Sequence, residues 1–153
     1  MNAATLLSDH QLRIVERVLD EERREHLVVY LSGAHAYGFP SPDSDLDLKA
    51  IHIEKTQHLV GLSSPRVTFD RAEVIEDVEI DYTSNELSLL LGGLIAGNGN
   101  YLERVLGTTA LVEHERLASL RPLVRRSLSK RYHHHYRGFA HSQRLALAAK
   151  PTA

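Results

Sequence analysis

Cysteine is missing from this chain of 153 residues, and so is any long run of apolar residues. The absence of cysteine excludes disulfides, thiolate nucleophiles and cysteine-ligated zinc, and it favours a cytoplasmic location. Because no stretch of about 18 apolar residues occurs, we expect no helix that crosses a membrane. The first residues, MNAATLLSDHQLR, lack a basic segment followed by an apolar one, so we expect no secretory signal. With 42% hydrophobic and 25% charged residues, the chain has the composition of one folded domain.

Acidic residues are absent from Arg116 to the end of the chain, a segment that contains nine lysines and arginines. The first 115 residues contain nine basic and all 20 acidic residues, a net charge of −11. This asymmetry predicts either that the two parts meet different partners or that they pack together and screen each other. We therefore divide the chain into a core of residues 1–112 and a basic helical segment of residues 113–153.

The pattern of apolar residues predicts an α+β fold, with a small mixed sheet flanked by helices and a helical C-terminal segment. Ser8 and Gln11 have the spacing of a capping box, which predicts a helix over residues 9–24. Strands are expected over residues 26–31, 45–53 and 78–83, with a short one near 66–69. Further helices are expected from a cap at Thr83 to a stop at Gly97, over 100–106, and along the basic segment, which Pro122 breaks before a last helix over 129–149. Turns and loops are expected over 32–45 and most of 54–77.

The residues best suited to ligand binding or catalysis lie between Gly33 and Asp47. Gly33 and Gly38 lie among small residues, which allows backbone amides to approach the oxygens of a phosphate. Asp45 and Asp47 alternate along the expected strand, so both carboxylates lie on one face. Two like charges this close favour a divalent cation with oxygen ligands. The alternative is a plain turn with an aspartate cap at the start of the strand.

A third carboxylate from a neighbouring strand, either Asp81 or Glu79, would complete this cluster. Three carboxylates beside a glycine turn are typical of two-metal phosphoryl transfer, with the ions roughly 3.5–4 Å apart. Lys49 shares the strand face of the aspartates, where it either neutralises them, contacts a phosphate or forms a plain ion pair. His35 lies within the glycine turn, where it either contacts the ligand or faces solvent.

Residues 31–53, LSGAHAYGFPSPDSDLDLKAIHI, resemble the signature of the DNA polymerase β-type nucleotidyltransferases. The stretch is most similar to a bacterial group with the pattern Gly-Ser-x-Ala-(Trp/Tyr)-Gly-Phe-x-Ser-x-Asp-Ser-Asp-x-Asp. Later similar stretches are Asp81-Tyr82-Thr83 with Glu86-Leu87-Ser88, Gly97-Asn98 with Leu102-Glu103, and Gly138-Phe139-Ala140 with Gln143. The resemblance covers about residues 27–145 and implies a minimal nucleotidyltransferase fold.

This resemblance implies that Asp45 and Asp47 bind Mg²⁺ or Mn²⁺, and that Asp81 is the third carboxylate and activates an acceptor hydroxyl. The resemblance, together with the positions of the turn and the strand, places five residues at a nucleoside triphosphate: Ser32, Gly33, Ala34, His35 and Lys49. The implied reaction moves an NMP, with AMP from ATP as the expected group, to a hydroxyl of a protein or a nucleic acid and releases pyrophosphate.

The sequence also departs from the family pattern. Ala34 stands where the family has a serine that helps to hold the triphosphate, and the loss of one such hydrogen bond costs on the order of 1.5–3 kcal/mol. Ser32 lies just before Gly33 and is a partial substitute, while Gly99 replaces a proline of the pattern. Such proteins carry more helix beyond this point, so the chain is expected to be a short or truncated member. These departures favour a second hypothesis, a weakened, antitoxin-like binding or regulatory module.

The C-terminal segment supports a third hypothesis, a nucleic-acid-binding protein whose affinity falls steeply with salt. Its basic residues either contact the triphosphate or a nucleic acid, or form a solvated helix face; they are Arg125, Arg126, Lys130, Arg137 and Arg144. His133, His134 and His135 are consecutive, so on a helix their side chains point about 100° apart. A helical metal site needs histidines four residues apart, and we expect none here.

Overall fold

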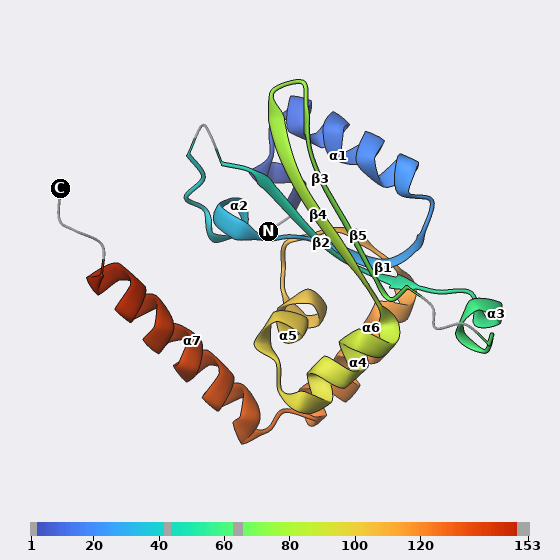
Figure 1. The fold of residues 1–153 in the computed structure, drawn as a ribbon, viewed down its shortest axis with the longest axis vertical. Helices are drawn as coiled ribbons and strands as arrows, with labels where there is room; N and C mark the ends of the chain where they lie inside the picture. Colours follow the sequence, from blue (N-terminus) through green and yellow to red (C-terminus); the bar gives the residue numbers. More distant parts are fainter. Residues whose placement is uncertain (1–2, 42–43, 63–65, 150–153) are drawn as a thin grey trace.

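The computed structural model describes residues 3–41, 44–62 and 66–149. Its centre is a five-stranded sheet with the strand order β3-β4-β2-β1-β5 (Figure 1). The strands are β1 (Glu25–Leu31), β2 (Leu46–Ile53), β3 (Thr68–Ile75), β4 (Val78–Glu86) and β5 (Ala110–Glu113). Strands β2 and β4 run parallel and the other neighbouring pairs run antiparallel. The sheet is therefore mixed, and the expected α+β class is confirmed.

Helices cover both faces of this sheet. They are η1 (Ala3–Leu6), α1 (Asp9–Glu22), α2 (Gly33–Tyr37), α3 (Thr56–Leu59), α4 (Leu87–Ala96), α5 (Gly99–Leu106), α6 (Glu115–Arg126) and α7 (Lys130–Ala148). Figure 1 shows α1 on one side of the sheet, α4, α5 and α6 on the other, and α7 extending away from the body. None of the helices in the described ranges is long and apolar enough to cross a membrane.

Alternation along the strands divides the hydrophobic core into two clusters. One lies under α1 and includes Leu46, Leu48 and Ala50 from β2. The second lies under α4, α5 and α6 and consists of Leu27, Val28, Ile51, Leu90, Leu94, Val105, Leu117 and Val124. Each fully buried aliphatic side chain contributes about 1.5–3 kcal/mol. The residues that alternate with Leu46 and Leu48 therefore face the side of α4 to α6, and this arrangement positions the candidate site.

The start of α1 and the end of α4 follow the expected signals. The Ser8 hydroxyl accepts a hydrogen bond from the backbone N–H of Gln11 at 3.2 Å, and the Gln11 side chain accepts one from the backbone N–H of Ser8 at 2.9 Å. This reciprocal capping box satisfies two N–H groups that the helix leaves unpaired. The expected stop of α4 is also confirmed, because Gly97 adopts φ 78° there.

Strand β4 is longer than expected, and the predicted helix cap at Thr83 is wrong. Thr83 lies within β4, and α4 starts after Glu86, whose carboxylate accepts from the backbone N–H of Ser88 at 2.6 Å. Pairing with β2 holds the chain extended as far as the partners His52 and Glu86. The buried hydroxyl of Ser84, 2.7 Å from Nδ1 of His52, adds to this pairing. Tertiary pairing thus overrides the local capping signal.

The stretch from 54 to 77 contains more regular structure than expected. It includes α3 and the eight-residue strand β3 in place of a short strand near 66–69. Strand β3 is an edge strand that pairs only with β4, so most of its residues are partly exposed and its polar composition hides it. A tight turn joins it to β4 at Glu76 and Asp77, which adopt φ 48° and 66°.

Three further expectations about helices and strands need correction. The stretch over 32–45, expected as turn and loop, contains α2, and β5 was not predicted at all. Pro122 lies inside α6, and the break falls instead at residues 127–129. Because a proline removes a single helical hydrogen bond, the burial of Leu117 and Val124 on either side keeps α6 continuous.

Helix α7 touches the body only near its start. The buried Tyr132 donates its hydroxyl to the carbonyl of Leu94 at 2.7 Å, and Tyr136 donates to the carbonyl of Gly99 at 3.3 Å. From Arg137 to the end of the helix, every residue is exposed. The second half of α7 therefore offers basic and apolar side chains to solvent.

The partly buried His26 makes the stability of the fold depend on pH. Burial lowers the pKa of His26 to about 4, helped by the nearby charges of His52 and Arg24. The unfolded chain therefore binds a proton near pH 6.5, and the folded protein does so only near pH 4. As the pH falls through this window, the free energy of unfolding should decrease, by on the order of 2 kcal/mol after allowance for solvent screening.

Denaturant unfolding at pH 7, 5.5 and 4 measures this decrease. A His26→Gln variant should show a smaller decrease with pH, whereas the exposed His133→Gln should behave like the original protein. If the free energy of unfolding falls equally with pH in His26→Gln and in the original protein, His26 is not the source of the pH dependence.

Candidate active site

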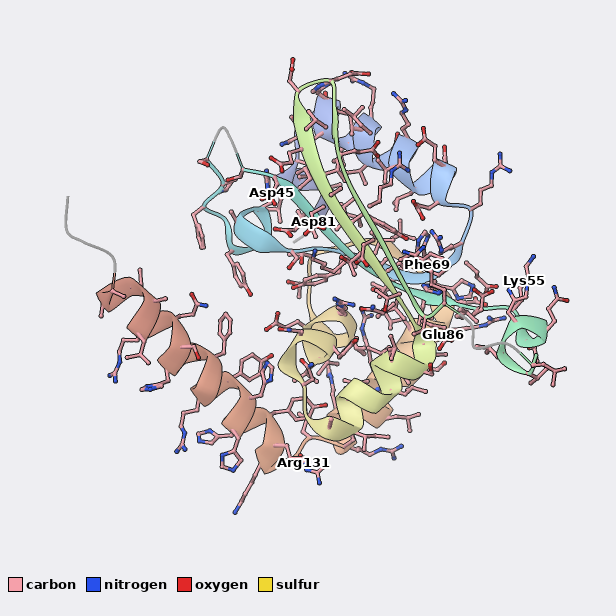
Figure 2. The ribbon with its side chains drawn as sticks, viewed as in Figure 1. Asp45, Lys55, Phe69, Asp81, Glu86 and Arg131 are labelled. Atoms are coloured by element: carbon pink, nitrogen blue, oxygen red, sulfur yellow. The ribbon has the colours of Figure 1, made fainter. Side chains whose placement is uncertain are left out.

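The register between β2 and β4 places two of the predicted carboxylates side by side. Asp47 pairs with Asp81, and the preceding residues Leu46 and Ile80 pair with each other. Leu46 and Ile80 are fully buried in the cluster under α1, so alternation directs both aspartates to the opposite face. Asp45 lies just before β2, and Figure 2 shows it at the same end of the sheet as Asp81.

Lys49 lies between the two paired carboxylates. Its Nζ is 2.8 Å from Oδ2 of Asp81 and 3.4 Å from Oδ1 of Asp47. Burial and the charge of Asp45 raise the pKa of the Asp47 carboxyl, and the charge of Lys49 opposes this. Asp47 therefore ionises less readily than an ordinary aspartate even with the ammonium in place.

The glycine turn lies directly on this cluster. The backbone N–H of Ser32 donates to the carbonyl of Asp47 at 2.8 Å, which holds the start of α2 against β2. Gly33 follows with φ +60°, and a Cβ at this position would lie 2.0 Å from Oδ2 of Asp47. Only glycine fits this approach, because both the backbone angle and the contact exclude a side chain. Gly38 closes the helix with φ 80°.

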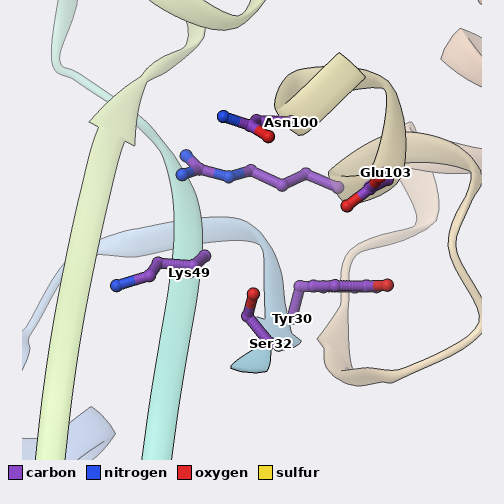
Figure 3. Close-up of a pocket in the computed structure, with 6 residues that line it drawn as sticks. Tyr30, Ser32, Lys49, Asn100 and Glu103 are labelled. Atoms are coloured by element: carbon purple, nitrogen blue, oxygen red, sulfur yellow. The ribbon is translucent and has the colours of Figure 1, made fainter. Parts of the chain in front are cut away.

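A cavity of about 190 Å³ opens beside the carboxylates, between the sheet and α5 (Figure 3). Its lining residues are Tyr30, Ser32, Lys49, Asn100, Glu103 and Arg104. The hydroxyl of Ser32 makes no capping bond to α2, so it is available to the cavity. The cavity is thus polar and adjoins the aspartate pair through Lys49.

The other candidates of the glycine turn lie differently. His35 is 4% exposed, and its Nε2 lies 3.4 Å from the side-chain amide of Gln11 on α1. The ring is therefore not solvent-facing, and its direction toward α1 does not favour direct contact with a ligand. Ala34 is partly buried, and its carbonyl accepts from the backbone N–H of Phe39 at 3.1 Å.

Of the two candidate acids on β4, Glu79 and Asp81, Asp81 is the one beside Asp47. Glu79 is exposed and pairs with Val74 of β3. The pairing of β4 with β2 includes Ile80 but not Glu79. The geometry therefore distinguishes between two acids that alternation alone leaves equivalent.

Among the described residues, no basic residue of the C-terminal segment lines this cavity. Arg116 donates to Glu25 at 2.9 Å and Arg121 donates to Glu113 at 2.7 Å, so the acidic and basic parts do pack against each other. The five basic residues named in the sequence analysis are all exposed; they are Arg125, Arg126, Lys130, Arg137 and Arg144. Arg104, which the sequence analysis missed, lines the cavity instead. Arg104 lies four residues after Asn100, so both share one face of the expected helix, and this spacing could have indicated a shared polar site.

The donor chemistry of the aspartate pair fits a divalent cation. In the described part of the chain, no three histidine, aspartate or glutamate side chains are gathered to hold a metal ion. The ammonium of Lys49 nevertheless occupies a cation position between the oxygens of Asp47 and Asp81. Carboxylate oxygens are the ligands that Mg²⁺ and Mn²⁺ prefer, so an ion of this kind suits the position.

A mixed sheet that carries an acidic strand beside a glycine-led helix defines the nucleotidyltransferase class. A family model described as the RNA repair pathway DNA polymerase beta family matches residues 7–152. The chain belongs to this family, and the resemblance found in the sequence is confirmed. It is also similar to the solved structure of a nucleotidyltransferase-like protein from Exiguobacterium sibiricum 255-15, with a TM-score of 0.49 and 11% identity. That match covers 78% of this chain and 39% of the other. Among curated proteins, none matches the sequence.

Proposed function

We propose that the protein is a Mg²⁺-dependent nucleotidyltransferase that moves an NMP, with AMP from ATP favoured, to a hydroxyl acceptor. The observation that carries this proposal is the pairing of Asp47 with Asp81 on one sheet face, with Gly33 packed on Asp47. In the reaction, the acceptor oxygen bonds to the α-phosphorus and passes its proton to the carboxylate of Asp81. The bond from the α-phosphorus to the bridging oxygen breaks, and pyrophosphate leaves.

In this proposal each residue has a stated part. Asp45, Asp47 and Asp81 would hold the divalent ions, and Asp81 would receive the proton of the acceptor hydroxyl. When bound, the ions neutralise the charge that develops on the phosphates and favour ionisation of the hydroxyl. The backbone at Gly33 and the hydroxyl of Ser32 orient the triphosphate in the cavity. Ala34 supplies no hydroxyl, so Ser32 is the remaining serine of the turn beside the cavity.

We propose a hydroxyl of RNA as the acceptor. The description of the family to which the chain belongs names an RNA repair pathway. The exposed second half of α7 supports this proposal, because it presents Arg137 and Arg144 to solvent. Residues 113–153 would then form the acceptor-binding segment beside a catalytic core of residues 1–112, and affinity for RNA would fall with salt.

Labelled ATP with Mg²⁺ or Mn²⁺ tests this function. RNA oligonucleotides with a free or a blocked 3′ hydroxyl serve as acceptors, together with a protein acceptor such as casein. We expect label on the RNA with the free hydroxyl and release of pyrophosphate. Label on the protein would show that the acceptor is a protein hydroxyl and not RNA. Absence of transfer to every acceptor would overturn the proposal.

A second candidate is a module that binds a nucleotide without transferring it. It is favoured by Ala34 at the usual serine position and by the absence of a three-ligand metal group from the described residues. Calorimetry would show metal-dependent binding of ATP without turnover in that case. Rapid consumption of ATP would exclude it.

Replacement of Lys49 tests the cation position between the carboxylates. A Lys49→Met variant should bind Mn²⁺ roughly 10-fold more tightly, equivalent to about 1.4 kcal/mol, because the competing ammonium is gone. Titration of Mn²⁺ by electron paramagnetic resonance measures this without any turnover. The exposed Lys55→Met is the matched control and should leave the affinity unchanged. Unchanged or weaker Mn²⁺ binding in Lys49→Met would contradict the prediction.

A further inference from the structure

Arg104 is a partly buried cation without an acidic partner among the described residues. Its Nη1 donates to Oδ1 of Asn85 at 2.6 Å, and its guanidinium lies 5.1 Å from the ring centre of Tyr101. Burial lowers the pKa of this guanidinium, although an arginine stays charged at neutral pH. Within the described ranges, no carboxylate forms an ion pair with it. The fold thus holds a positive charge that only a neutral amide and an aromatic ring compensate.

Other partly buried arginines of the protein show the usual arrangement. Arg71 pairs with Glu21 and Glu73, and Arg121 pairs with Glu113. A buried charge costs free energy unless an opposite charge or several hydrogen bonds compensate it. Arg104 is therefore an exception that calls for an anion supplied from outside the chain.

The surroundings of Arg104 offer that anion a place. Arg104 lines the cavity beside the carboxylates, together with Ser32, Asn100 and Lys49, which all carry hydrogen-bond donors. Figure 3 shows Ser32 and Asn100 on opposite sides of this space. The volume of about 190 Å³ is several times that of a water molecule, so a tetrahedral anion has room.

Glu103 also lines the cavity and would repel an anion if its carboxylate faced the centre. Its Oε1 instead accepts a hydrogen bond from the hydroxyl of Tyr136 at 3.0 Å. Tyr136 belongs to α7, so this bond draws the carboxylate toward α7. The guanidinium, with five N–H donors in a planar fork, matches two oxygens of one phosphate.

We infer that Arg104 binds a phosphate group in this cavity and that this phosphate is its missing counter-ion. The inference rests on the proposed function, because it names a residue that would hold a substrate phosphate beside the aspartates. The phosphate belongs either to the polyphosphate of the nucleotide or to the RNA acceptor. Both sources present the same chemistry to the guanidinium.

Binding measurements in metal-free buffer with EDTA test this inference independently of transfer. The ligands are tripolyphosphate, ATP, adenosine and a short oligoribonucleotide. Arg104→Gln should weaken the phosphate ligand that uses the site by about 10–100-fold, the size of a lost charged hydrogen bond. Adenosine, which has no phosphate, should be unaffected. If only tripolyphosphate and ATP lose affinity, the phosphate bound by Arg104 belongs to the nucleotide. If only the oligoribonucleotide loses affinity, the phosphate belongs to the RNA acceptor.

Two further variants separate binding from folding and from general charge. Arg104→Lys keeps the charge but loses the fork, so its affinity should lie between those of the original protein and Arg104→Gln. Arg13→Gln removes an exposed charge of α1, on the other side of the sheet from the cavity, and should bind like the original protein. Phosphate should raise the thermal midpoint of the original protein and not that of Arg104→Gln. A purely structural Arg104 would lower the midpoint without ligand but leave this shift intact.

The inference is overturned if no phosphate ligand binds the original protein, if Arg104→Gln binds all of them as tightly, or if Arg13→Gln weakens them as much as Arg104→Gln does. Arg104-dependent binding without any transfer would support the inference while overturning the proposed function. Transfer that is indifferent to Arg104→Gln, together with unchanged binding, would overturn the inference alone.

Discussion

An Asp47→Asn variant is expected to lose NMP transfer by at least about 10³-fold, because one metal-binding carboxylate is replaced by a neutral amide. Asp47 is the central member of the cluster: it pairs with Asp81 across the strands, lies within reach of Lys49, and is covered by Gly33. An asparagine has nearly the same shape, so the packing of α2 on β2 should survive. Single-turnover assays with labelled ATP measure the loss.

The same substitution should leave the fold intact. Burial raises the pKa of the Asp47 carboxyl, which means that the folded protein does not favour its charge. The free energy of unfolding should therefore change by less than about 1 kcal/mol. Asp70→Asn is the matched control, since Asp70 is exposed on β3 and should affect neither transfer nor stability. Near-normal transfer by Asp47→Asn would remove Asp47 from the catalytic cluster.

The part of the site that follows from local pattern was predictable from the sequence. A period of two along 45–53 places Asp45, Asp47 and Lys49 on one face, and the buried residues of β2 bear this out. Pattern does not reveal which strand lies beside β2, nor in what register. The choice between Asp81 and Glu79 depends on a two-residue offset in a parallel pairing, so it needed the structure.

Features created by tertiary packing could not be predicted. Strand β4 continues past Thr83 because β2 pairs with it, although the local residues favour a helix cap. His35 is buried against α1, which a glycine-rich stretch does not indicate. Arg104 belongs to a helix that was expected, yet its lack of an acidic partner is visible only where α5 meets β2 and β4.

A Gly33→Ala variant is expected to lose both transfer and stability, for reasons of space. The added Cβ would lie 2.0 Å from Oδ2 of Asp47, far inside contact distance, so either the carboxylate or the start of α2 must move. The backbone also has φ +60°, which costs an alanine about 1–2 kcal/mol. Displacement of packed groups adds roughly 1–3 kcal/mol. Because Asp47 is the group displaced, transfer should fall by about 10²-fold or more, as expected for reacting groups misplaced by about 1 Å.

Gly38→Ala separates the backbone cost from the clash. Gly38 has φ +80°, at the opposite end of α2, but no atom lies within 4 Å of a Cβ built there. This variant should therefore lose only the conformational cost of about 1–2 kcal/mol and retain transfer. Denaturant unfolding gives the two stabilities, and single-turnover assays give the two rates. If both alanine variants lose stability and transfer by the same amounts, the positive φ alone explains why residue 33 must be glycine. The close contact between α2 and Asp47 would then not be the reason.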